Sequence, residues 1–327
     1  MPVAEAATPC RVWPEDTAGF STFKVGRLQH NFHQHPLFQL DELERLAHEL
    51  EPLRQCRFVR PGITQGSSFA HADRHPDGRS IAEVFRRLDE PGSWLALYNV
   101  EAVPRYMALL EEVIATVRPI IEREQSGIFN ITGFIFLSAP PSVTPFHIDR
   151  ENNFWLQLHG RKTMNVWSHT DRVVVPADAV EDFIVSHSLK RVRYREELRE
   201  RSHEFETVPG DGVYFPSTSP HMTRSVVEGA GPRDGVSVSI GVNFYTDVTR
   251  NTARVHQVNR LLRKVFGVVP AYPGESPAMD ALKAPLGKVV GATRQMLGKT
   301  RRAVRGWRWG DLASMSWRGG KEPPGSF

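Results

Sequence analysis

The sequence predicts a mainly β fold with flanking helices, whose core is a barrel or double-sheet sandwich of the jelly-roll kind. Short runs rich in β-branched and aromatic residues follow one another between residues 129 and 245, separated by Gly, Pro and Asp. Helical periodicity occurs in the stretches before and after these runs. The length of 327 residues suits one such core with helical additions, and several short strands in succession are typical of jelly rolls.

The first third of the chain carries three helical patterns. Apolar residues recur at three- and four-residue spacing from Leu43 to Leu50, which predicts a helix over Leu40–Leu50. Similar patterns predict helices over Ser80–Leu88 and Pro104–Glu124. We therefore expect residues 1–128 to form a helical region that packs on the core.

Residues 129–250 form the predicted jelly-roll core. The strands that we expect in it are Phe129–Ala139, Asn153–Leu158, Thr163–Trp167, Glu204–Val208, Gly212–Pro216 and Val236–Tyr245. The helical pattern returns over Asn251–Gly267, and a Pro/Gly segment then precedes a last helical and basic region. We expect residues 251–327 to form a C-terminal extension whose helices could join two copies of the chain as a homodimer.

Cysteine usage and hydropathy indicate a soluble protein of the cytoplasm. Cys10 and Cys56 are the two cysteines, too few for a disulfide framework or a multi-cysteine metal site, and they favour a reducing compartment. No stretch approaches the ~18 apolar residues that a membrane span needs. The first residues do not have the pattern of a signal peptide.

The net charge of +4 is unevenly distributed. From Lys283 to the end there are ten Lys and Arg against two acidic residues, whereas residues 1–282 carry 31 basic and 35 acidic groups. The mildly acidic core is therefore not expected to bind nucleic acid. In the tail, Trp307, Trp309 and Trp317 stand among arginines, so contact with nucleic acid or a membrane surface stays open there beside a solvated end or a docked amphipathic helix.

The segment 144–162 contains the best candidates for a metal site. Residues two apart on a strand share a face, so His147 and Asp149 can point at one spot. His221 follows a strand–turn–strand pattern and is the candidate third ligand. Two imidazoles and one carboxylate form the facial arrangement that holds non-haem Fe(II) and leaves other positions open. Taken alone, a His-x-Asp motif is weak evidence and more often has a structural role.

Around this motif the sequence resembles the JmjC or cupin-like Fe(II)/2-oxoglutarate oxygenases, especially the factor-inhibiting-HIF branch. The resemblance extends over roughly residues 130–247. It rests on the pattern Thr144-Pro145-x-His147-x-Asp149, then Asn153, Gln157, Gly160 and Lys162, and downstream a Pro-Gly-Asp turn, His221 and Asn243-Phe244. One departure follows Lys162, where members of the family often have a Pro-rich turn and this chain runs through Trp167 into Ser-His-Thr-Asp-Arg.

The resemblance implies a double-stranded β-helix, as in cupin and JmjC proteins, with Fe(II), 2-oxoglutarate as co-substrate, and O₂. It implies that Fe(II) is bound by the catalytic residues His147, Asp149 and His221. It also implies that the co-substrate is bound by Lys162, which pairs with its distal carboxylate, and by Thr144, Asn153 and Asn243. A buried dicarboxylate needs a cation and hydrogen-bond donors, which these residue types supply.

Two arginines are alternatives for binding the co-substrate or the substrate. Arg233 stands twelve residues after His221, where some 2-oxoglutarate oxygenases place the carboxylate-binding arginine, but its Gly/Pro surroundings predict an outward hairpin loop. Arg224, nearer the ligand, could line the substrate entrance. We prefer Lys162 for the carboxylate.

The predicted function is hydroxylation of a C–H bond with release of succinate and CO₂. The substrate could be a protein or peptide side chain, an amino acid or a small metabolite, because substrate-selecting residues lie outside the motif. Demethylation of a methyl-lysine is also known in the wider family, although no zinc-finger or reader motif accompanies the core. Two alternatives remain: a non-catalytic cupin-like binding or sensor module, and a metal-dependent cupin hydrolase or isomerase.

Overall fold

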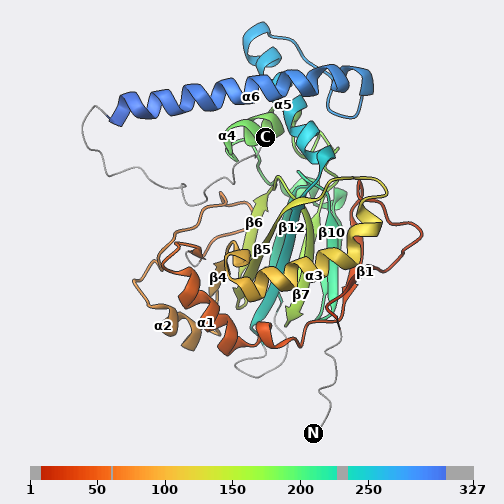
Figure 1. The fold of residues 1–327 in the computed structure, drawn as a ribbon. Helices are drawn as coiled ribbons and strands as arrows, with labels where there is room; N and C mark the ends of the chain where they lie inside the picture. Colours follow the sequence, from red (N-terminus) through yellow and green to blue (C-terminus); the bar gives the residue numbers. More distant parts are fainter. Residues whose placement is uncertain (1–8, 60–61, 227–234, 307–327) are drawn as a thin grey trace. The chain divides into compact units, whose positions relative to one another are not determined.

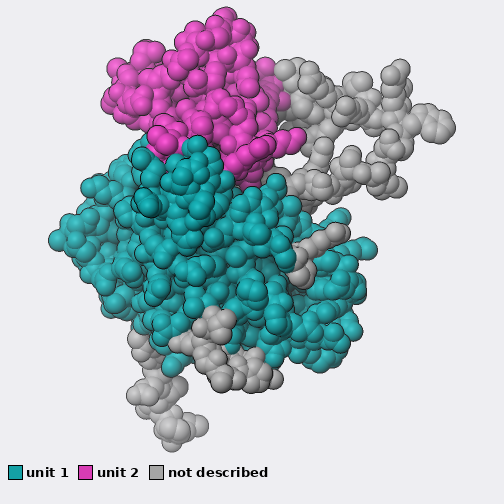
Figure 2. All heavy atoms as spheres, turned by 180° about the vertical axis from the view of Figure 1, so that it is seen from behind, with its two compact units in different colours: residues 1–170, 194–246 teal, residues 171–193, 247–327 magenta. Residues whose placement is uncertain are grey.

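The computed structural model describes residues 9–59, 62–226 and 235–306, and the chain divides into two units (Figures 1 and 2). Unit 1 comprises residues 1–170 and 194–246, and unit 2 comprises residues 171–193 and 247–327. The predicted division at residues 128 and 250 stays a prediction. The tail with Trp307, Trp309 and Trp317 lies outside the described residues.

Unit 1 is built on two antiparallel sheets (Figure 1). The larger has eight strands in the spatial order β1 (Val12–Pro14), β2 (Gly26–His30), β10 (Asp211–Phe215), β7 (Asn152–His159), β12 (Ser237–Tyr245), β5 (Phe129–Ser138), β4 (Trp94–Leu97) and β3 (Cys56–Phe58). The smaller has four, in the order β6 (Val143–His147), β11 (His221–Ser225), β8 (Lys162–Val166) and β9 (His203–Thr207). The predicted jelly-roll core of two antiparallel sheets is confirmed.

The two faces of the eight-stranded sheet differ in polarity. On one face Val238, Ile240 and Val242 of β12 belong to a hydrophobic core that also contains apolar residues of the helices of unit 1. The opposite face of β12 presents Ser239, Gly241 and Asn243, since successive side chains of a strand alternate. This second face is turned toward the four-stranded sheet, because Ser239 accepts a hydrogen bond from Lys162 of β8. The space between the sheets is therefore partly polar.

In the described residues of unit 1, three α-helices and three short 3₁₀ helices accompany the sheets. They are α1 (Leu40–Leu50), α2 (Ile81–Arg86), α3 (Pro104–Ile121), η1 (Pro36–Phe38), η2 (Val100–Ala102) and η3 (Glu196–Arg201). Figure 1 shows α3 lying across the outer face of the large sheet. Leu109, Leu110 and Val113 of this helix are buried there in the hydrophobic core, which holds the helix on the sheet.

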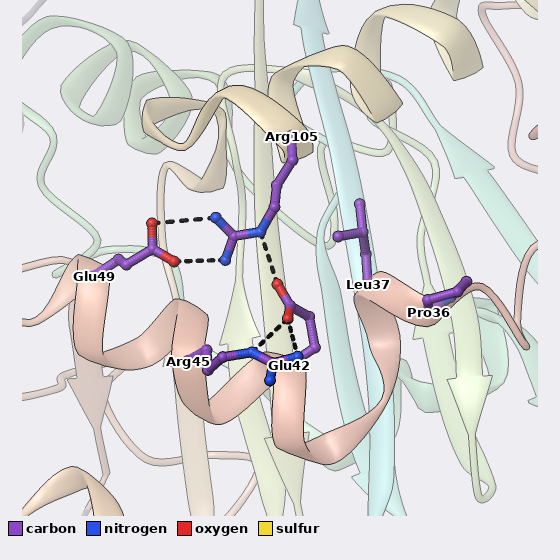
Figure 3. A pocket seen from close by; sticks show the side chains of 6 residues that line it. All are labelled: Pro36, Leu37, Glu42, Arg45, Glu49 and Arg105. Atoms are coloured by element: carbon purple, nitrogen blue, oxygen red, sulfur yellow. Dashed lines mark hydrogen bonds and ion pairs between the residues drawn. The ribbon is translucent and has the colours of Figure 1, made fainter.

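A cavity of about 430 Å³ lies between α1 and α3, and charged side chains line it (Figure 3). Arg105 donates from Nε to Glu42 at 2.7 Å and from Nη2 to Glu49 at 2.6 Å. Arg45 donates to the same Glu42 carboxylate at 2.7 Å. Each of these charges has an opposite partner, so the network ties the two helices together and needs no ligand.

Unit 2 consists of α4 (Ala177–Ser186), α5 (Asp247–Phe266) and α6 (Pro277–Gly306). Both α4 and α6 pack against α5. Arg263 of α5 forms two hydrogen bonds with the buried carboxylate of Glu181 on α4, at 2.9 and 3.0 Å. Among the described residues, no helix is both long enough and apolar enough to cross a membrane.

The predicted helix over Leu40–Leu50 is found as α1, and the six predicted strands are found within one or two residues of their expected ends. The sequence analysis did not predict β1, β2, β3 and β4, which the N-terminal third adds to the large sheet beside its helices. Of these strands, β1, β3 and β4 have three or four residues, too few for a period of two to be visible.

Candidate metal centre

His147 and His221 lie side by side because their strands pair. β6 and β11 are antiparallel neighbours, and in their register His221 faces His147, with ring centroids 4.1 Å apart. The Nδ1 atom of His147 lies 2.7 Å from the carbonyl oxygen of Pro145, and that of His221 lies 3.0 Å from the carbonyl oxygen of Ser219. Because a carbonyl accepts, both Nδ1 atoms carry the proton, and both Nε2 atoms keep a lone pair for a ligand.

Asp149 joins the two imidazoles from the loop after β6. Its Oδ2 atom lies 3.4 Å from Nε2 of His221 and 3.8 Å from Nε2 of His147. The backbone N–H of Thr218 donates to the carbonyl of Asp149 at 2.8 Å, which fixes the loop before β11 to the loop after β6. One ligand atom from each of the three side chains lies within 4.8 Å of the others, a spacing that a single metal ion can bridge.

The electrostatics of this cluster favour metal-binding protonation states. Burial, with a smaller contribution from His221, lowers the pKa of His147 to about 4. Burial alone would raise the pKa of Asp149, but the two imidazoles beside it lower the pKa below its usual value. At neutral pH the cluster is therefore a carboxylate with a neutral His147 imidazole beside it, as a divalent cation requires.

Lys162 is a buried basic side chain for which the described residues supply no acidic partner. It begins β8, and its side chain is 3% exposed. Its Nζ atom donates to the hydroxyl oxygen of Ser239 at 3.2 Å and lies 6.0 Å from the ring centroid of Phe136. In the described part of the chain no carboxylate forms an ion pair with it, and burial lowers the pKa of Lys162 to about 7.

A row of polar side chains crosses the large sheet opposite the small sheet. Asn243 of β12 is in register with Thr132 on β5 and with Asn153 on β7. Three atoms of this row are buried and form no hydrogen bond, namely Oγ1 of Thr132, Oδ1 of Asn153 and Nδ2 of Asn243. Gly241 is the neighbouring position on β12, where an added Cβ would lie 3.3 Å from the Asn153 side chain. The row thus offers unused donors and acceptors beside a position without a side chain.

The predicted site residues all lie in the interior of unit 1, but they form separate groups. His147, Asp149 and His221 come together, whereas Asn153 and Asn243 lie on the larger sheet and Lys162 lies on the smaller one. Thr144 is on β6, where its hydroxyl accepts a hydrogen bond from Nε1 of Trp94 at 3.2 Å. The ligand and co-substrate roles of these residues stay predictions.

Arg224 does not line the interior. Along β11, His221, Thr223 and Ser225 share one face, and Arg224 lies on the opposite one, in register with Thr163. The expectation that Arg224 lines a substrate entrance is therefore not met by its position. Arg233 lies outside the described residues.

An extended segment near residues 63–75 contributes residues that the sequence analysis missed. Phe69 stacks on the ring of His147, with centroids 4.3 Å apart and planes at 10°. His71 contacts the ring of Tyr98 at 5.4 Å, and burial lowers the pKa of His71 to about 4. The segment is held by the N–H of Phe146, which donates to the carbonyl of Gln65 at 2.9 Å. We call residues 63–75 the strap.

Acidic and aromatic groups lie next to Asp149. Glu151 accepts a hydrogen bond from the Tyr245 hydroxyl at 2.5 Å and another from the backbone N–H of Arg150 at 2.9 Å. Burial and the charge of Asp149 raise the pKa of Glu151, and burial with both carboxylates raises the pKa of Tyr98. Tyr98, Glu151 and Tyr245 come from three segments that are distant in the sequence, so no motif indicated that they lie close together.

Comparison with known proteins gave one family match and several structural matches. A family model described as the JmjC domain matches residues 123–248. A search of curated proteins found no match. Among solved structures, the ribosomal oxygenase YcfD from Escherichia coli is 18% identical with a TM-score of 0.39, and its complex with cobalt and 2-oxoglutarate is 18% identical with a TM-score of 0.36. A third, the same protein with cobalt and succinic acid, is 17% identical with a TM-score of 0.35. The first two alignments each cover 74% of this chain, which spans 57% of the length of those structures.

Proposed function

We propose that the protein is an Fe(II)- and 2-oxoglutarate-dependent oxygenase, because a family model described as the JmjC domain matches residues 123–248. The observation that carries the proposal is that one interior contains both a His-Asp-His cluster and a buried lysine that has no acidic partner among the described residues. An isolated cation in a protein interior is costly, so a lysine in this environment indicates that an anion completes the site.

The residues present fit Fe(II). Two imidazoles with free Nε2 atoms and one carboxylate are the donor set of the facial triad, and they would occupy one side of the ion. The carbonyls of Pro145 and Ser219 would hold the two rings in the ligating tautomer. His147, Asp149 and His221 would thus bind the metal through two strands whose register is fixed by backbone hydrogen bonds.

The residues also fit a dicarboxylate co-substrate. Lys162 would pair with the distal carboxylate of 2-oxoglutarate, while Ser239, which accepts from Lys162, would keep the ammonium in place. Thr144 has an oxygen that accepts from Trp94, so its hydroxyl proton is available to donate. The unpartnered amide atoms of Asn153 and Asn243 would contact the co-substrate or bound water.

When bound, the iron supplies the redox chemistry in which substrate, O₂ and 2-oxoglutarate are converted into hydroxylated substrate, succinate and CO₂. The chain contributes the positions of the reactants. Asp149 and the two histidines would hold the metal, and the strap places Phe69 against His147. Phe69 would restrict water next to this ligand and so protect the site from side reactions.

The finer part of the proposal is that the reaction hydroxylates a C–H bond of a protein or peptide side chain, an amino acid or a small metabolite. Both cysteines are free and buried, which is consistent with a reducing compartment, and we propose the cytoplasm as the location.

The test uses the full chain without oxygen. Adding Fe(II) and 2-oxoglutarate should give the weak visible charge-transfer band of an iron–keto-acid chelate, and His147→Ala should abolish it. The matched control is His75→Ala, because this histidine also belongs to the strap region but contacts Phe58 and not the cluster. No band in the wild type, or an unchanged band in His147→Ala, would overturn the proposal.

Two further measurements separate the alternatives. Formation of succinate from 2-oxoglutarate under air is expected of an oxygenase and not of a binding or sensor module. A Lys162→Ala variant that keeps full activity on a substrate would instead favour a hydrolase or isomerase, which needs the metal but no second carboxylate.

A further inference from the structure

Two of the candidate metal ligands depend on loops that are bonded to each other. Asp149 lies in residues 148–151, between β6 and β7, and His221 directly follows residues 216–220, between β10 and β11. We call these segments the first and the second ligand loop. The backbone N–H of Thr218 in the second loop donates to the carbonyl of Asp149 in the first. The bonds between the loops therefore affect the distance between the two candidate ligands.

The side chain of Asn152 adds a buried connection at the same place. Asn152 is the first residue of β7 and is fully buried. Its Oδ1 atom accepts a hydrogen bond of 3.0 Å from the backbone N–H of Ser217. The hydroxyl of Ser217 in turn donates to the carbonyl of Arg150 at 2.8 Å. Two successive residues of the second ligand loop, Ser217 and Thr218, are thus bonded to the first loop and to the residue that ends it.

Gln125, which follows α3, fixes the orientation of the Asn152 amide. Oε1 of this buried glutamine accepts from Nδ2 of Asn152 at 3.1 Å and from the hydroxyl of Thr246 at 2.8 Å. Its Nε2 atom donates to the carbonyl of Thr22 at 2.9 Å. Rotation of the Asn152 amide by half a turn would place donor against donor and acceptor against acceptor, so Oδ1 stays directed at the second ligand loop.

The turn that receives these bonds has an unfavourable backbone conformation. Thr218 has a φ of 63°, in the left-handed region, which a β-branched residue rarely adopts. Such a conformation persists only where the surroundings impose it, and it occurs preferentially at functional sites. Here the bonds from the N–H groups of Ser217 and Thr218 hold two successive peptide groups of the turn.

Stability of the fold alone gives no reason for a polar pair at this place. Replacing both partners of a buried hydrogen bond by apolar groups of the same shape can be nearly neutral for stability. The bond of Asn152 instead ends on the backbone of a strained turn, three residues before Thr218 is followed by His221. The polar pair is therefore directed at the geometry of this turn.

We propose that Asn152, oriented by Gln125, is a positioning residue for the metal centre. It holds the second ligand loop in the strained conformation that sets Asp149 and His221 at ligating distance, and it does not touch the metal itself. This inference rests on the proposed function, in which these two residues and His147 bind Fe(II).

Titration of the full chain with Co(II), followed by the visible spectrum, measures metal binding, and urea unfolding without metal measures the fold. Asn152→Leu has a similar shape and loses both hydrogen bonds. Its affinity for Co(II) should fall by about ten- to a hundredfold, the usual effect of removing a group that orients ligands, and the band shape should change. Gln125→Leu should have a similar effect. The double variant should bind Co(II) as Asn152→Leu does, because Gln125 acts through Asn152.

The control variant is Tyr106→Phe. It removes another buried hydrogen bond, from the hydroxyl of Tyr106 on α3 to the carbonyl of Leu37 at 2.7 Å, which has no contact with the ligand loops. Tyr106→Phe should lower the free energy of unfolding and leave the Co(II) affinity and spectrum unchanged.

Thr218→Gly separates positioning from stability without changing a buried polar pair. Glycine adopts a positive φ without strain, so the metal-free variant should be at least as stable as the wild type. Its Co(II) affinity should nevertheless fall, because the turn is no longer restricted to one conformation. This variant also keeps the test decisive if Asn152→Leu does not fold.

Three results would overturn the inference: an unchanged Co(II) affinity and spectrum in Asn152→Leu or, where that variant does not fold, in Thr218→Gly; an equal loss of affinity in Tyr106→Phe; or additive losses in the double variant. A wild type that does not bind Co(II) would overturn the proposed function itself, which distinguishes the two failures.

Discussion

Nζ of Lys162 donates a hydrogen bond of 3.2 Å to the hydroxyl of Ser239, and this bond joins β8 of the small sheet to β12 of the large one. Burial lowers the pKa of Lys162 from 10.5 to about 7. The protonated form is thus held inside the fold at a cost, which an anion bound next to it would offset. Several measurable properties follow from this pair and from its surroundings.

The free energy of unfolding of the ligand-free protein should rise as the pH increases from about 7 to about 10. The pKa of Lys162 in the folded protein lies below its value in the unfolded chain. Between these two values the unfolded chain binds more protons at this residue than the folded protein does, so the free energy of unfolding rises with pH. Lys162→Met should be more stable than the wild type below pH 7, by on the order of a few kcal/mol, and should lack this rise. Urea unfolding at a series of pH values checks both, and a variant less stable than the wild type at low pH would contradict the argument.

Binding of 2-oxoglutarate should take up a proton at pH 8. With a pKa of about 7, Lys162 is mostly neutral at this pH, and a carboxylate next to it favours the ammonium form. Anaerobic titration calorimetry in two buffers of different ionisation enthalpy should therefore give heats that differ in proportion to the protons taken up. The affinity should also fall above pH 7. Equal heats in the two buffers would show that no proton is taken up, and would contradict the role of Lys162 in binding the co-substrate.

Phe69→Ala should weaken metal binding while the fold is kept. The ring stacks on His147 at 4.3 Å, and an aromatic pair of this kind contributes about 1 kcal/mol to holding the imidazole in place. We expect a Co(II) affinity lower by up to about tenfold, measured from the visible spectrum of the bound ion. The control is Ser68→Ala, the exposed neighbour on the strap. An unchanged affinity would show that the stack does not orient His147.

Gly241→Ala should reduce the affinity for 2-oxoglutarate and leave metal binding intact. The added methyl would lie 3.3 Å from the Asn153 side chain and 3.6 Å from Oδ1 of Asn243, inside the row of unpartnered polar atoms. We expect a loss of stability of about 1 kcal/mol from this overpacking. Gly235→Ala is the matched control, since its Cβ would make an ordinary 3.5 Å contact with Pro140 away from this row. Equal 2-oxoglutarate affinities of the two variants would contradict the assignment.

Local patterns in the sequence were sufficient for the elements with long periodic runs. The helix over Leu40–Leu50 and the strand ending at Tyr245 have enough residues for a period of 3.6 or 2 to be recognised. His147 and Asp149 could be named from their spacing, and His221 from the strand–turn–strand pattern before it and from the family resemblance. The structure brings one ligand atom of each within 4.8 Å of the others.

Other parts of the site depend on contacts that no local pattern encodes. Phe69 reaches His147 from a strap that lies more than seventy residues earlier in the chain, and neither residue's neighbours in sequence indicate the stack. The place of Arg224 was misjudged because facing depends on strand register, and a shift of one position turns a side chain to the opposite face. The last helical region was recognised in the sequence, but the exposure of Leu282 and Leu286 in α6 depends on which face of this helix packs on α5.

The ion pair of Glu181 with Arg263 has a consequence for how the chain can be divided. Glu181 lies on α4, in the stretch of sequence between the candidate ligands Asp149 and His221, whereas Arg263 follows the last of them. A protein truncated after Thr246 would keep every candidate ligand and still carry a helix with a carboxylate that has lost its cation, and such a loss is strongly destabilising for a buried charge. Unit 2 can therefore be deleted or transplanted only by two excisions, because the polypeptide enters it, leaves to complete the candidate metal centre, and enters it again.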